Sequence, residues 1–411
     1  MFSLVAGLAA FSAYFSMYAF RKPIGAAQYA QVAGWDYTLG YKSALLIAQV
    51  LGYALSKAVG IKVIAEMGRA RRGLTIIALI MLAWVALIGF ALVPAPWNIA
   101  FLLLNGFPLG LIWGLVFSYL EGRRTSDLLG AMLCASFIVS SGVVKSVGGW
   151  LLLQGVSEFW MPAATGALFF PLLFASVWLL EQLPPPDAGD EAARTPRVPM
   201  NAGERAALVK AHGLLLIVLV LAYLLVSALR DFRDNFAAEL WAAMGYAHDP
   251  ALFSASELPI GAIVLVTIGA IVVVRNNRRA LAIMNAVIMA GMALLAGSTF
   301  AFQAGMLGPL AWMILSGLGL YLAYTPFNAM LFDRMIALFG KPGNAGFLIY
   351  IGDAAGYAAS VALLLYRSFG APKLAWLNFY IAACYAIAAM VALCMVVALL
   401  NERGRTDHAT L

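Results

Sequence analysis

Two long apolar stretches, one in each half of this chain, contain an arginine. Arg21 lies near the end of the first stretch, and Arg230 lies near the end of a stretch in the second half. A guanidinium group in hydrocarbon is costly, so it normally faces a water-filled cavity or a partner group. Because arginine binds carboxylates and phosphates through two parallel hydrogen bonds, this pair predicts an anion site related by a two-fold axis.

Arg230 belongs to a short run of charges that includes Asp231, Arg233 and Asp234. The four residues occupy about one helical turn, in which positions three and four apart are neighbours. Two interpretations follow. Either Arg230 is free to bind substrate while Arg233 pairs with Asp234, or the four residues form a structural ion network.

Arg21 also has an alternative role, which it would share with Lys22. Pro23 and Gly25 can end the helix there. Both basic side chains would then extend to the outer lipid headgroups instead of facing a cavity. Basic residues are otherwise scarce on that side, which favours the anion site.

Three further charged side chains lie within apolar stretches. Lys145 lies among small residues that permit close helix packing, so its ammonium group must reach water or an acid. It is a candidate to bind the anion together with Arg21 and Arg230, and a structural pair with Glu257 is the alternative. Lys57 lies near the end of its stretch, where it can bind substrate or reach the membrane surface. A carboxylate at the depth of Asp353 must be protonated or paired.

The composition predicts the class of fold in which these residues lie. Hydrophobic residues make up 64% of the 411 residues and charged residues only 11%. This predicts an all-helical protein that crosses a membrane many times. A transmembrane barrel is not expected, because the apolar runs are continuous and do not alternate. The first stretch lacks a basic leader and a cleavage site, so we interpret it as a retained span.

Apolar runs of about 20 residues predict twelve membrane-spanning helices. The expected ranges are 3–24, 41–61, 73–93, 97–120, 127–153, 160–182, 212–241, 255–275, 279–302, 307–332, 343–367 and 374–400. Basic residues concentrate in the loops after even-numbered spans, which predicts that both termini are cytoplasmic. The break at 184–210 is proline-rich and charged, which predicts a cytoplasmic linker between six-helix bundles at 1–183 and 211–402, with a tail at 403–411.

Cysteines and histidines do not suggest metal or redox chemistry. Cys134, Cys384 and Cys394 are unclustered and lie in apolar stretches, and the three histidines lack ligand spacing. We therefore expect no metal and no cofactor. The net charge of +7 reflects the basic loops, and no nucleic-acid partner is expected.

Six spans on each side of a central loop resemble the major facilitator superfamily. The loop at 60–72 is similar to the basic loop that follows the second span in that superfamily, although Ala65 stands where an acidic residue is expected. Several short segments also resemble the organophosphate:phosphate antiporters, in the same order along the chain. They are Arg21-Lys22, Ser56-Lys57, Lys145-Ser146-Val147-Gly148-Gly149, Leu229-Arg230, Glu257, and the glycine-rich stretch from Gly343 to Gly356. The sequence outside these short segments resembles a bacterial facilitator-type family of unassigned function.

These resemblances imply a fold and roles for particular residues. The two bundles are expected to rock about a site at the membrane midplane. The arrangement implies that Lys57 faces Asp353 and that Lys145 faces Glu257, as salt bridges made in one state and broken in another. Lys145 stands where the antiporters carry a histidine, which favours a multiply charged anion because an ammonium group is charged at neutral pH.

Aromatic residues on the first and tenth spans are expected to line the cavity in such a fold. Tyr14 and Tyr18 share one helix face, and Tyr324 lies on the tenth span. Their hydroxyl groups could bind substrate oxygens, although ordinary packing between helices is an equal alternative.

The sequence therefore predicts a secondary transporter, not an enzyme, for a small organic anion such as a phosphate or phosphonate ester. Anion exchange would need no titrating group, whereas proton symport would use Asp353, Glu257 or Asp231. Asp234 and Arg233 are expected to contribute to gating. The alternatives are a translocator of lipids or amphipathic solutes and a non-transporting anion sensor. We expect a monomer in the bacterial inner membrane.

Overall fold

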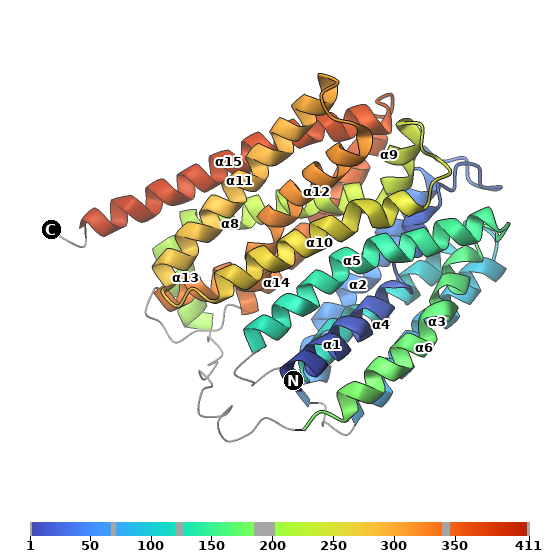
Figure 1. The fold of residues 1–411 in the computed structure, drawn as a ribbon, viewed down its shortest axis with the longest axis horizontal. Coiled ribbons are helices and arrows are strands. Elements are labelled where there is room, and N and C mark those ends of the chain that lie inside the picture. Colours follow the sequence, from blue (N-terminus) through green and yellow to red (C-terminus); the bar gives the residue numbers. More distant parts are fainter. Residues whose placement is uncertain (1, 67–70, 121–125, 185–201, 339–345, 409–411) are drawn as a thin grey trace. The chain divides into compact units, whose positions relative to one another are not determined.

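The computed structural model of this chain describes residues 2–66, 71–120, 126–184, 202–338 and 346–408, and the regular elements within these ranges are helices (Figure 1). The first half contains α1 (Phe2–Tyr18), η1 (Pro23–Ala26), α2 (Tyr41–Glu66), α3 (Arg72–Leu92), α4 (Ile99–Phe117), α5 (Ser126–Leu153) and α6 (Met161–Glu181). The second half contains α8 (Ala202–Asn235), α9 (Ala237–Ala243), α10 (Ala251–Val272), α11 (Asn277–Gln303), α12 (Pro309–Pro326), η3 (Phe327–Leu331), α13 (Phe332–Leu338), α14 (Gly346–Leu365), η4 (Tyr366–Gly370) and α15 (Trp376–His408).

Many of these helices are long and apolar enough to cross a membrane. Nine such candidates occur in the described parts of the chain, and the apolar helix at Val5–Tyr18 is shorter. The multi-pass helical architecture expected from composition is therefore confirmed. The exact number of twelve spans stays a prediction.

The boundaries of the seventh predicted span differ most from the structure. Helix α8 begins at Ala202, and its backbone departs from helical geometry at His212, where φ is −129° and ψ is 20°. The predicted start at His212 thus coincides with a break inside the helix. At the other end α8 stops at Asn235, and the short helix α9 contains Glu239.

The chain folds into two compact units. Unit 1 comprises residues 1–194, 234–265 and 364–377, and unit 2 comprises 195–233, 266–363 and 378–411. The boundary between Arg233 and Asp234 therefore falls inside α8. As a result, the charged run of α8 is divided, with Arg230, Asp231 and Arg233 in unit 2 and Asp234 in unit 1.

Helices α2 and α4 of unit 1 approach each other closely because glycine replaces a side chain at two points. A Cβ atom on Gly52 would lie 2.1 Å from the Leu103 oxygen, and one on Gly106 would lie 2.1 Å from the Gln49 oxygen. Beside this contact the buried side chain of Asn105 donates to the Phe20 oxygen over 3.0 Å. The end of α1, where Arg21 follows, is thereby tied to α4.

Glycine also allows α14 to approach α8 inside unit 2. A Cβ atom on Gly352 would lie 2.6 Å from a ring carbon of Tyr223, and one on Gly356 would lie 3.2 Å from the Cβ of Ser227. Larger residues at these positions would push the helices apart. The glycines therefore allow Asp353, next to Gly352, to reach the hydroxyl group of Tyr223.

Candidate functional site

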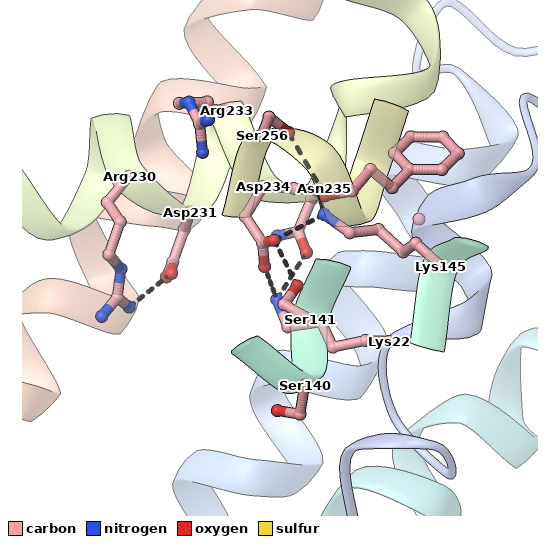
Figure 2. A network of polar contacts seen from close by, with 12 residues as sticks. Lys22, Ser140, Ser141, Lys145, Arg230, Asp231, Arg233, Asp234, Asn235 and Ser256 are labelled. Atoms are coloured by element: carbon pink, nitrogen blue, oxygen red, sulfur yellow. Dashed lines mark hydrogen bonds and ion pairs between the residues drawn. The ribbon is translucent and has the colours of Figure 1, made fainter. Parts of the chain in front are cut away.

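Two lysines converge on one carboxylate in unit 1. Lys145 Nζ lies 2.6 Å from Asp234 Oδ1 and also donates to the Asp234 main-chain oxygen over 2.9 Å. Lys22 Nζ forms an ion pair with the other oxygen of Asp234 and donates to Asn235 Oδ1 over 3.0 Å. Ser141 donates to the same carboxylate. Figure 2 shows these groups meeting at Asp234, and we call Lys22, Ser141, Lys145 and Asp234 the lysine cluster.

The lysine cluster is buried. The side chains of Lys22, Lys145 and Asp234 are 10%, 1% and 6% exposed. Two ammonium groups and one carboxylate give these three residues a net charge of +1. Lys22 is thus held in the interior of unit 1, so the alternative in which it extends to the lipid headgroups does not describe this residue.

The partners in the lysine cluster differ from those expected for Lys145 and Arg233. Lys145 pairs with Asp234, where Glu257 had been expected. Glu257 is buried and packs against Gly142, one helical turn from Lys145. Asp234 binds the lysines, whereas Arg233 Nη2 donates to the Met313 oxygen over 2.8 Å within unit 2. The side chains of adjacent helical residues point in different directions, so Arg233 and Asp234 reach different partners.

A second buried ion pair in unit 1 was missed by the sequence analysis. Lys42 Nζ lies 2.8 Å from both carboxylate oxygens of Glu239 and 3.3 Å from the Gly25 oxygen. Lys42 had been interpreted as a loop charge because it precedes the second apolar stretch. Its isolation on a side of the chain poor in basic residues was the signal that could have identified it.

The first predicted anion-binding arginine lies against an aromatic ring in unit 1. The Arg21 Cζ atom lies 4.2 Å from the centre of the Tyr53 ring, and the side chain is half-buried. Tyr14 and Tyr18 are buried and contact each other edge to face with ring centres 5.4 Å apart. Their contact fits the packing alternative as well as a ligand role.

The second predicted arginine, Arg230, lies against two partners of unit 2. Its Cζ atom is 3.8 Å from the centre of the Tyr324 ring, and its Nη2 atom is 2.6 Å from Asp231 Oδ1. The other oxygen of Asp231 accepts from Ser360 over 2.9 Å. The pair of Arg230 and Asp231 is drawn in Figure 2. Both side chains are partly exposed, at 16% and 17%.

A hydroxyl network continues from Tyr324 to Asp353. The Tyr223 hydroxyl donates to Asp353 Oδ1 over 2.8 Å and lies 3.5 Å from the Tyr324 hydroxyl. Asn328 Nδ2 donates to Tyr223 over 3.1 Å. The sequence analysis missed Tyr223, although it precedes Arg230 by seven residues and so shares its helix face. We call Tyr223, Arg230, Asp231, Tyr324, Asn328 and Asp353 the tyrosine network.

Some predicted features lie outside the described residues. The side chains of Lys57 and Cys134 are among them, so the predicted pairing of Lys57 with Asp353 stays a prediction. Among the described residues no group of three or more histidine, cysteine or acidic side chains could hold a metal ion.

Comparisons with known proteins identify the fold and a family. The profile of a protein family described as a family of unknown function (DUF5690) matches residues 23–402. No curated protein matches the chain by sequence.

Three solved structures illustrate the structural likeness. The xylose transporter XylE from E. coli is 15% identical with a TM-score of 0.58, covering 96% of this chain and 95% of that one. A proton-dependent oligopeptide transporter is 11% identical with a TM-score of 0.65, covering 97% of both chains. The nucleoside transporter NupG is 13% identical with a TM-score of 0.60, covering 97% and 98%. This chain therefore has the major facilitator fold.

Proposed function

Because this chain belongs to the family of unknown function DUF5690 and has the major facilitator fold, we propose that it is a secondary transporter of a small organic anion. The proposed substrate class is a phosphate or phosphonate ester. Alternating access would move it across the bacterial inner membrane, with both chain termini in the cytoplasm and one chain as the working unit.

The observation that carries this proposal is the arrangement of contacts around the guanidinium group of Arg230. Among the described residues its hydrogen bonds involve Nη2 alone, which donates to Asp231. Stacking on Tyr324 fixes the plane of the guanidinium group. Nε and Nη1 keep their N–H groups for an oxyanion, and the partly exposed side chain gives a ligand access to them.

The basic residues of unit 1 support the same substrate class. Lys22 and Lys145 share Asp234, so the loss of this carboxylate to another partner would leave two ammonium groups for an anion. We assign Arg21, Lys57, Tyr14 and Tyr18 to substrate binding as well. Such fixed positive charge favours a dianion over a monoanion.

The acidic residues would serve coupling or gating. We assign Asp231, Asp234, Glu257 and Asp353 to this role, together with Arg233. Exchange against a second anion and symport with a proton both fit such a set.

Uptake by proteoliposomes tests the proposal. Purified protein would be reconstituted, and uptake of a radiolabelled alkyl phosphate would be compared with that of empty vesicles. We expect saturable uptake, and we expect Arg230→Lys to lower it at least about tenfold because lysine keeps the charge but loses the planar fork. Saturable binding without uptake would instead support an anion sensor, and lipid transfer without phosphate uptake would support a translocator.

Arg367→Lys provides the matched control. Arg367 also stacks on an aromatic ring, with its Cζ atom 4.5 Å from the centre of Trp376, but it lies in η4 and outside the tyrosine network. Uptake should be unchanged by this substitution. Equal losses for both variants would contradict a specific role for Arg230.

A further inference from the structure

Four arginines gather at one end of unit 2. Arg275 lies in the turn between α10 and α11, Arg278 and Arg279 lie in the first turn of α11, and Arg334 lies in α13. Helix α13 contacts α11, so the four residues belong to one region (Figure 1). The segments 273–280 and 332–338 contain a single acidic residue, Asp333. We call the four arginines the arginine surface.

Hydrogen bonds hold the turn that carries these residues in a defined conformation. The Arg334 Nη1 atom donates to Asn277 Oδ1 over 2.8 Å and to the Arg275 main-chain oxygen over 3.5 Å. The Asn276 side chain caps α11 by accepting from the Arg279 main-chain N–H over 3.0 Å. The turn is therefore fixed at both ends, to α13 and to the start of α11.

The other three arginines of this surface have exposed side chains. Among the described residues, no hydrogen bond or ion pair engages the guanidinium groups of Arg275, Arg278 and Arg279. The basic residues in the interior of unit 1 differ, because each of them binds a carboxylate of the chain. The three exposed guanidinium groups are therefore available to an anion from outside the chain.

Exposed apolar side chains lie next to these arginines. Val266 on α10 and Val273 just after it are 73% and 76% exposed, and they lie about two helical turns apart on one side. Ile283, one turn after Arg279 on α11, is 40% exposed. Both helices are apolar enough to cross a membrane, so these side chains are expected to contact lipid chains. The change from valine to arginine then marks the level of the lipid headgroups.

We propose that the arginine surface binds the phosphate headgroup of an anionic phospholipid, whose chains lie along the exposed apolar side of α10. Guanidinium groups bind phosphate oxygens through two parallel hydrogen bonds. Clusters of four or more basic residues beside a membrane helix attract anionic lipids. The arginine surface shares no residue with the tyrosine network, so this lipid is a ligand separate from the transported solute.

A lipid titration of the purified full chain tests this inference. The midpoint of thermal unfolding in a neutral detergent would be followed as dioleoylphosphatidylglycerol or dioleoylphosphatidylcholine is added. We expect the anionic lipid to raise the midpoint until the site is saturated, and the neutral lipid to have no such effect. Arg278→Gln combined with Arg279→Gln should raise the lipid concentration that gives half of this shift at least about tenfold, since each basic residue at an anionic surface contributes a factor of about five.

Lys373→Gln provides the matched control. It removes an exposed positive charge from the loop before α15, away from the arginine surface, and should leave the lipid requirement unchanged. A second test needs no variant. Potassium chloride at about 1 M, where the Debye length is about 3 Å, should weaken the effect of the anionic lipid on the unmodified chain.

Three results would overturn the inference. The first is an equal shift of the midpoint by the two lipids. The second is an equal requirement for the anionic lipid in the double variant and the unmodified chain. The third is a shift caused by inorganic phosphate that the double variant loses, because this surface would then be a site for free anions and not for lipid. None of these results bears on the substrate proposed for Arg230.

Discussion

The two units hold their charged groups in different ways. In unit 1, Lys22 and Lys145 are buried and bind the carboxylate of Asp234 directly. In unit 2, Arg230 is partly exposed and lies on the Tyr324 ring, and hydroxyl groups link Tyr324 to Asp353. Buried ion pairs are costly to break, whereas stacking and hydroxyl contacts can rearrange around a ligand. The lysine cluster is therefore suited to hold one conformation for as long as Asp234 binds both lysines, whereas the tyrosine network can rearrange without breaking a buried ion pair.

The largest effect is expected from Asp234→Asn. The substitution would leave two buried ammonium groups close together without their shared carboxylate. Breaking a buried ion pair costs about 3–5 kcal/mol, so we expect a large fall in the midpoint of thermal unfolding in detergent.

A double variant provides the control for this effect. Lys145→Met in the Asp234→Asn background removes one of the stranded charges, and it should recover part of the lost stability. An unchanged midpoint for Asp234→Asn alone would mean that the lysine cluster does not stabilise unit 1, and the contrast between the units would fail.

An intermediate effect is expected from Tyr223→Phe. The change removes the hydroxyl group that donates to Asp353 and accepts from Asn328, but it leaves no unpaired cation. Loss of a buried hydrogen-bond partner costs about 1–3 kcal/mol, so the unfolding midpoint should fall less than for Asp234→Asn. Tyr246→Phe, at an exposed tyrosine, should have no effect. A larger loss for Tyr223→Phe than for Asp234→Asn would reverse the ranking of the two regions.

The sequence predicted helices well because membrane spans follow from length and hydropathy. It also selected most charged side chains that the structure brings into contact, since a charge in an apolar stretch needs a partner. Arg230, Lys145 and Asp234 were identified in this way.

Their partners were predicted less well, because local spacing does not report contacts between distant segments. Lys22 and Asp234 are 212 residues apart in the chain, yet they form an ion pair, whereas both interpretations of the charged run had grouped Asp234 with Arg233. Lys42 was passed over for a similar reason, since its partner Glu239 lies in a short helix that hydropathy merged with the preceding span.

The smallest effect is expected where the two units are most alike. Each unit places one predicted anion-binding arginine on a tyrosine ring, at 4.2 Å for Arg21 on Tyr53 and 3.8 Å for Arg230 on Tyr324. A partly exposed cation–π contact contributes about 0.5–1 kcal/mol. A double-mutant cycle of Arg21→Met and Tyr53→Leu should return a coupling energy of this size from unfolding midpoints.

The same cycle at Arg230 and Tyr324 should return a larger coupling. There Asp231 holds the guanidinium group from the side, so its contact with the ring is more completely ordered. If the cycle at Arg21 and Tyr53 gives the larger coupling energy, the more strongly ordered arginine lies in unit 1. The anion site would then be expected beside Tyr53 and not beside Tyr324.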